Sequence, residues 1–232
     1  MMKTSFATLF LVFIYCSLSG QDFNTMTGDW IRVKSEYSDG GKVPNNDPSR
    51  VYVRYHFTKK ELYQIIFENT LPGVYTRTGN IFKIEPIQVF VIEHYTDKAL
   101  TLVDAEGPRP IRYCLIPTDS FQTTRKYVSE VVNGDSVYTV APGIEPMYPK
   151  GQNEFMSSIT SGFSQQTVAF NFTYIVQRDG TIGEVAIQVS SNPKLDKRLV
   201  QMVKKSSGKW IPATYHGKPI NVRMKGAFSF RG

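Results

Sequence analysis

The sequence predicts a two-domain protein, in which a small antiparallel β-domain precedes an α+β domain with a three-stranded antiparallel sheet and a packed helix. The chain has 232 residues, which suits two small domains because the commonest domain size is about 100 to 150 residues. Its 15 Phe and 13 Tyr favour strands over disorder. Residues 150–232 hold 12 Lys and Arg against 4 Asp and Glu, whereas residues 1–149 hold 15 against 16. The basic excess therefore lies in the last third, where it either attracts an anionic partner or forms a solvated face.

The first 20 residues predict a secretory signal peptide. Lys3 precedes an apolar run over residues 6–15, and the small residues Ser17, Ser19 and Gly20 follow it. An uncleaved inner-membrane anchor is the alternative, but the run is shorter than the roughly 20 residues that a spanning helix needs. After cleavage Cys114 is the only cysteine, so no disulfide can form within the chain.

Residues 21–117 predict the β-domain. Short apolar or alternating runs are separated by turn residues such as Pro72-Gly73, Gly79-Asn80 and Thr96-Asp97. The runs cover residues 51–57, 62–67, 89–95 and 100–103. The more polar residues 118–147 that follow predict a linker, although 137–140 could form a short strand.

Residues 148–232 predict the α+β domain. Two alternating runs, 168–176 and 185–189, flank Asp179-Gly180, which is typical of a two-residue hairpin turn with positive φ at both positions. A helix should begin at Asn192-Pro193, because Asn is a common cap and Pro suits the first helical position. Its apolar stripe is Leu195, Leu199, Met202 and Val203. An alternating run over 220–230 predicts the last strand, and a short helix is expected over 151–159.

This last third resembles the carboxy-terminal domain of TonB. The order of its motifs carries the resemblance: an aspartate-glycine hairpin, a proline-led helix with a leucine-aspartate pair, a tryptophan followed by a proline, and a glycine-lysine-proline turn. In this chain the motif residues are Asp179, Gly180, Pro193, Leu195, Trp210, Pro212, Gly217 and Pro219. The resemblance implies a binding domain in the periplasm of a Gram-negative cell envelope, which engages the peptide of an outer-membrane TonB-dependent transporter and could support transmembrane transport.

The candidate binding site is the last strand, at 220–230. Because this strand follows a helix that must cover one face of the sheet, we expect it to be an edge strand that recruits a peptide by β-strand addition. Arg223 and Lys225 would either discourage indiscriminate pairing or select an acidic peptide. The residues expected to contact the partner are Glu145, Asn221, Val222, Arg223, Met224 and Lys225.

The β-domain carries a weaker resemblance to the lipocalin-like domains of bacterial envelope proteins. Gly28-Asp29-Trp30 and the runs over 75–84 and 92–102 carry it. It implies a small barrel or half-barrel, which holds an apolar ligand or is filled by its own side chains. The alternative function is therefore a periplasmic carrier of a small apolar ligand, tethered to peptidoglycan by the basic domain.

The sequence offers no pattern for catalysis or metal binding. His56, His94 and His216 lie far apart and have no metal-site spacing, and nucleophile-elbow and phosphate-loop motifs are absent. We therefore expect a protein that is not an enzyme and has no cofactor, metal or catalytic residue. Secretion and the lack of an aromatic RNA-binding motif also argue against nucleic acid.

Overall fold

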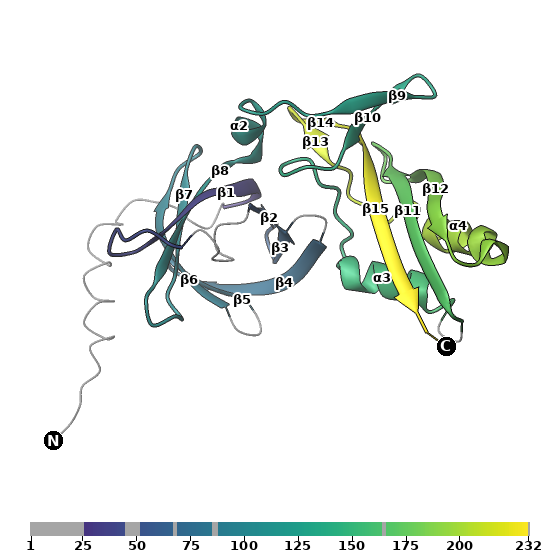
Figure 1. The fold of residues 1–232 in the computed structure, drawn as a ribbon. Coiled ribbons are helices and arrows are strands. Elements are labelled where there is room, and N and C mark those ends of the chain that lie inside the picture. Colours follow the sequence, from purple (N-terminus) through teal and green to yellow (C-terminus); the bar gives the residue numbers. More distant parts are fainter. Residues whose placement is uncertain (1–25, 45–51, 67–68, 85–87, 164–165, 232) are drawn as a thin grey trace.

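The computed structural model describes residues 26–44, 52–66, 69–84, 88–163 and 166–231 (Figure 1). The predicted signal peptide lies outside these residues. Within the described ranges, no helix combines the length and the apolar character that crossing a bilayer requires.

The described residues of the amino-terminal domain form a closed, up-and-down barrel of eight antiparallel strands. Each strand pairs with the next, and β8 closes the barrel by pairing with β1. This confirms the predicted small β-barrel. The strands are β1 (Gly28–Tyr37), β2 (Val53–Phe57), β3 (Glu61–Ile66), β4 (Asn69–Thr78), β5 (Ile81–Ile84), β6 (Gln88–Tyr95), β7 (Leu100–Asp104) and β8 (Ile111–Pro117).

The interior of the barrel is packed with the inward-facing side chains of alternating residues. The Phe57 ring meets the Phe82 ring edge-on at a centroid distance of 6.0 Å. The Phe90 ring stacks on Phe82 at 5.0 Å. All three rings are almost completely buried, as are Leu62, Ile92, Leu100 and Leu102. The buried guanidinium of Arg32 lies 4.6 Å from the centre of the Tyr113 ring. Aromatic burial of this kind is the main driving force for closing such a small barrel.

Pro72 and Gly73 do not form the predicted turn. We expected a turn, but both residues lie within β4, where Pro72 pairs with Tyr63. β4 pairs with β5 only from Tyr75 onward. Pro72 therefore occupies a part of the strand with one neighbour, where a missing N–H is tolerated.

The carboxy-terminal domain has a five-stranded sheet in the order β12-β11-β15-β10-β9, so the prediction of three strands is wrong. Residues 118–147 supply the two additional strands, and β10 pairs in parallel with β15. β9 was not predicted because most of its side chains are exposed, so it has no alternating apolar pattern. The elements are α2 (Thr118–Gln122), β9 (Ser129–Val132), β10 (Asp135–Thr139), α3 (Gln152–Thr160), β11 (Val168–Val176), β12 (Ile182–Ser190), the 3-10 turn η3 (Pro193–Leu195), α4 (Asp196–Lys204), β13 (Thr214–Tyr215), β14 (Lys218–Pro219) and β15 (Asn221–Phe230).

Helices α3 and α4 cover one face of this sheet, as Figure 1 shows. Leu199 and Val203 of the predicted stripe are fully buried, and Leu195 and Met202 pack against the same core. Asn192 makes no capping hydrogen bond through its side chain, and Pro193 begins a 3-10 turn ahead of α4. The helix is thus confirmed, but its predicted cap is not.

The two domains contact each other through both apolar and charged side chains. Tyr63 and Ile65 on the outside of β3 form a buried cluster with Met147. Arg54 of β2 reaches Glu145, and a Cβ on Gly151 would lie 3.0 Å from Pro72 of β4. Helix α2 connects the end of β8 to the second domain (Figure 1).

Candidate functional site

The candidate site is the second half of β15, because its backbone is paired on one side only. β15 pairs with β11 from Val222 to Phe230, but β10 pairs with it only over Asn221–Arg223. The expectation of an edge strand is therefore wrong for the first part of β15, which lies inside the sheet. Beyond Arg223 no other strand of the described residues pairs with this side of β15, since β10 ends at Thr139.

The hydrogen bonds of Arg223 identify the backbone groups that face the open side. The carbonyl of Arg223 accepts from the Val140 N–H at 3.3 Å, so Arg223 directs its backbone toward β10. The N–H and C=O of one strand residue point to the same side, and the direction alternates along the strand. Lys225, Ala227 and Ser229 therefore direct N–H and C=O groups toward the open edge, where no strand of the described residues pairs with them. The sequence pattern alone could not show which alternate residues face this edge.

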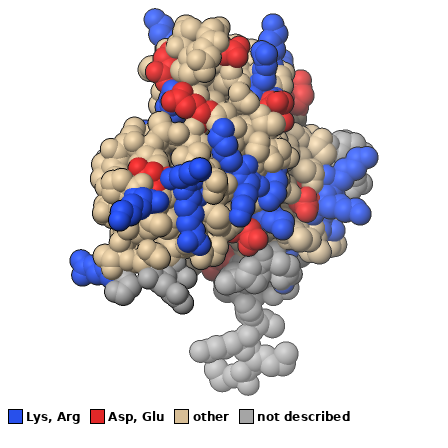
Figure 2. All heavy atoms as spheres, turned by 90° about the vertical axis from the view of Figure 1, so that its right-hand side faces the viewer, with Lys and Arg blue, Asp and Glu red and all other residues tan. Residues whose placement is uncertain are grey.

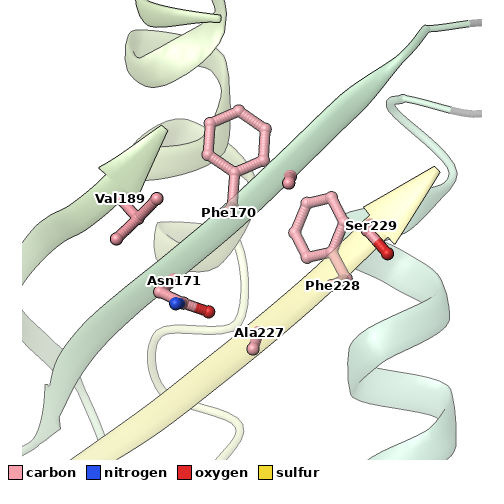
Figure 3. Close-up of a pocket in the computed structure, with 7 residues that line it drawn as sticks. Phe170, Asn171, Val189, Ala227, Phe228 and Ser229 are labelled. Carbon is pink, nitrogen blue, oxygen red and sulfur yellow. The ribbon is translucent and has the colours of Figure 1, made fainter. Parts of the chain in front are cut away.

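The side chains on the outer face of the open half of β15 are exposed, and a hollow lies beside them over the neighbouring strands. Lys225, Ala227 and Ser229 are exposed, whereas Met224 is completely buried in the core. A hollow of about 270 Å³ lies over the ends of β11, β12 and β15, as Figure 3 shows. Its lining is Ala169, Phe170, Asn171, Val189, Ala227, Phe228 and Ser229. The small residues at 227 and 229 were the signal for this space in the sequence.

Three of the residues expected to contact a partner are hydrogen-bonded or buried within the chain. The Arg223 Nε donates to Glu130 of β9 at 2.7 Å. The Asn221 side chain accepts from the Arg178 N–H at 2.9 Å and reaches the Ser136 carbonyl at 3.5 Å. Val222 is fully buried. These contacts fix the hairpins around β15, and of the six residues only Met224 and Lys225 belong to the open half.

Glu145 lies away from this edge, at the contact between the domains. Its carboxylate lies 3.4 Å from Arg54 of the barrel and accepts from the Gly143 N–H at 2.9 Å. Burial raises the pKa of Glu145 to about 7, and the nearby Arg54 charge opposes this rise only in part. Arg54 also lies 3.4 Å from Asp29, which in turn lies 3.2 Å from the His56 ring. Glu145 thus belongs to a buried charge network that joins the two domains.

A basic surface follows helix α4 on the outer side of the carboxy-terminal domain. Figure 2 shows this side, where Lys and Arg outnumber Asp and Glu. The basic side chains on η3, α4 and the following turn are exposed and form no ion pair with another described residue. They are Lys194, Lys197, Arg198, Lys204, Lys205 and Lys209. The basic excess of the sequence is therefore concentrated in part on one helix.

The motif residues build turns and core contacts behind the open edge. Trp210 packs against Tyr148, Phe155 and Tyr174, and its ring N–H donates to Ser206 at 3.0 Å. Gly217 has φ +70° in the turn between β13 and β14, and Pro219 ends β14 next to the start of β15. Pro212 is half-buried beside the buried Ala213. Their arrangement holds β15 against β11.

Comparison with known proteins relates this domain to a family. Searches of curated proteins and of solved structures found no match. The family model described as Gram-negative bacterial TonB protein C-terminal matches residues 166–231, which run from just before β11 to the end of β15. Residues 166–231, in the carboxy-terminal domain, are therefore similar to the C-terminal domain of TonB, and in this chain they follow an eight-stranded β-barrel.

Proposed function

We propose that this protein is a non-enzymatic adaptor of the Gram-negative cell envelope, which captures an extended peptide from an outer-membrane transporter by β-strand addition. The observation that carries the proposal is the half-open β15 in a domain of the TonB C-terminal family. An open strand edge supplies backbone hydrogen bonds without regard to sequence, and neighbouring side chains supply selectivity. The family also supports a periplasmic location and a role linked to transport.

The added strand would pair with Lys225, Ala227 and Ser229. The exposed Lys225 ammonium favours an acidic residue in the peptide, while the small, exposed side chains of Ala227 and Ser229 would not obstruct a neighbouring strand. Arg223 takes less part, because Glu130 already neutralises it.

The test is a titration of a protein spanning residues 21–232 with amino-terminal peptides of outer-membrane transporters from the same host. The two-domain protein is needed because β9 and β10 complete the sheet. Ala227→Pro removes an N–H that faces the open side and leaves the pairing with β11 in place. Peptide affinity should fall by roughly tenfold or more, because proline cannot donate to the added strand.

Ala227→Ser is the matched control, since it changes the side chain at the same position and keeps the N–H. It should bind peptide like the unaltered protein. Equal binding by Ala227→Pro and Ala227→Ser, with both shown to be folded, would contradict strand addition at this edge.

In the alternative function the barrel carries a small apolar ligand, and the basic domain anchors the protein to peptidoglycan. The basic surface on α4 favours the anchor, because exposed, unpaired cations attract anionic polymers. Peptidoglycan fragments therefore form the second arm of the titration, and binding of these fragments without binding of peptide would favour this alternative. For the barrel, the tight packing of Phe57, Phe82 and Phe90 supports a filled spacer over a carrier.

A further inference from the structure

A cavity of about 360 Å³ lies where the barrel meets the carboxy-terminal domain. One wall comes from the start of β1 and the end of β6, another from the start of α2, and a third from the hairpin of β13 and β14. Its volume lies within the roughly 300 to 1,000 Å³ that is usual for small-ligand sites. The proposed function does not use this cavity.

The walls of the cavity are fixed relative to one another by Gln122. This side chain is fully buried, and its Nε2 donates to the carbonyls of Gly143 and Thr214, both at 2.7 Å. Its Oε1 accepts from the His216 N–H at 2.8 Å. Helix α2 is thereby attached to the hairpin on the opposite wall, so the cavity is formed before any ligand enters.

Three carboxylates line the cavity, in a protein whose net charge is +7. Burial alone would raise the pKa of Asp29. The hydrogen bond with His56 and the charge of Arg54 together outweigh this effect, so the pKa lies below its ordinary value and the side chain stays ionised. Asp97 and Asp119 are exposed at the rim, and neither has an ion-pair partner among the described residues. Arg54 is shared with Glu145, so negative charge remains in excess.

Thr118 supplies an independent indication of a ligand. Its side chain is 3% exposed and lines the cavity, and its hydroxyl has no hydrogen-bond partner within the described part of the chain. A buried hydroxyl without a partner costs free energy, and a ligand in the cavity would satisfy it.

The other lining residues favour an organic cation over a metal ion. No three His, Cys, Asp or Glu side chains in the described ranges are close enough to hold a metal. Trp30 and Tyr95 line the same cavity, with ring centres 5.9 Å apart. Aromatic rings beside carboxylates suit a cation that also has an apolar body. We propose that this cavity binds a small aliphatic amine, whose ammonium groups lie between Asp97, Asp119 and Asp29 and donate to Thr118.

The experiment titrates the protein of residues 21–232 with 1,4-diaminobutane at constant ionic strength, followed by calorimetry and by amide chemical shifts. Saturable binding is expected, with shifts at Tyr95 on one wall and at Thr214 and Gly217 on the other. The uncharged 1-butanol and calcium chloride should produce no such saturation.

Replacing Asp97→Asn and Asp119→Asn together should weaken amine binding by roughly tenfold or more, because a charge-assisted contact is lost at each position. Thr118→Val should weaken binding severalfold without changing the cavity's charge. Asp135→Asn, an exposed position on β10 outside the cavity, is the control and should bind normally.

Both carboxylates are exposed and unpaired, so circular dichroism should show folded variants. Absence of saturable diamine binding would overturn the proposal. So would undiminished binding by the double variant, or calcium binding in place of the amine.

Discussion

Glu145 illustrates how much a single residue's environment decides. The sequence analysis placed it among the residues expected to contact a partner. In the structure it is 3% exposed and faces Arg54, 91 residues away along the chain. A buried ion pair of this kind contributes little net stability, because desolvating both charges offsets their attraction. The main consequence of burying Glu145 is that the stability of the protein depends on pH.

The stability of the protein should therefore fall as Glu145 ionises. Its pKa rises from an ordinary 4.5 to about 7 in the folded chain, so the folded state binds the proton more tightly than the unfolded state. The resulting contribution is complete below pH 4.5 and is lost as the pH rises through 7. Glu145→Gln cannot titrate. The unfolding free energy of the unaltered protein, relative to this variant, should fall by up to about 3 kcal/mol over that range.

Urea denaturation at a series of pH values measures this difference directly. A difference between the two proteins that does not change between pH 4.5 and 7 would show that folding does not raise the pKa of Glu145.

At the scale of elements, the hairpin between β11 and β12 was predicted correctly but its turn was not. The strands end at Val176 and begin again at Ile182, so five residues connect them. Only Gly180 has a positive φ in this turn, and the Asp179 carboxylate accepts from the Thr181 N–H at 2.9 Å. Gly180 is also pressed against the chain after α4, because its carbonyl accepts from the Gly208 N–H at 2.9 Å.

Gly180→Ala should consequently destabilise the domain strongly. A Cβ at this position would lie 2.3 Å from the Trp210 carbonyl oxygen, and φ is +80°. We expect a loss of about 2 to 4 kcal/mol in unfolding free energy, from backbone strain together with the displaced segment. Gly208→Ala is the matched control, since φ is +78° there but a Cβ would meet open space. It should cost only about 1 kcal/mol in the same urea titration. Equal losses for the two variants would contradict the role of the Trp210 contact.

The elements that the sequence predicted are those with local signals. The apolar stripe of α4, the hairpin around Asp179-Gly180 and the alternating runs of the barrel each depend on neighbouring residues. β9 lacked such a signal because its side chains are mostly exposed. β10 joins the sheet through a parallel pairing of Val137–Thr139 with Asn221–Arg223, which lie more than 80 residues further along the chain. The open half of β15 follows from where β10 stops, so it could not be read from β15 itself.

At the scale of the whole molecule, the contact between the domains decides whether they behave as one body. Met147 packs on Tyr63 and Ile65 of the barrel, while its backbone N–H and carbonyl both pair with Ile211 of the second domain. The Arg54 and Glu145 network and the Gln122 hydrogen bonds add polar contacts to this boundary. A peptide bound at β15 would thus act on a domain that is fixed to the barrel.

The two tryptophans make this coupling measurable, because Trp30 lies in the barrel core and Trp210 in the core of the second domain. In Trp210→Phe the remaining tryptophan, Trp30, reports on the barrel. In Trp30→Phe the remaining tryptophan, Trp210, reports on the second domain. In both proteins, fluorescence and circular dichroism should follow one common unfolding transition.

Adding Met147→Asp places an unpaired charge in the buried contact, which costs several kcal/mol, so the two fluorescence transitions should separate. Val131→Asp is the control, because Val131 is 76% exposed on β9 and its substitution should leave the transitions coincident. If the two reporters already separate without Met147→Asp, the contact between the domains does not couple their folding.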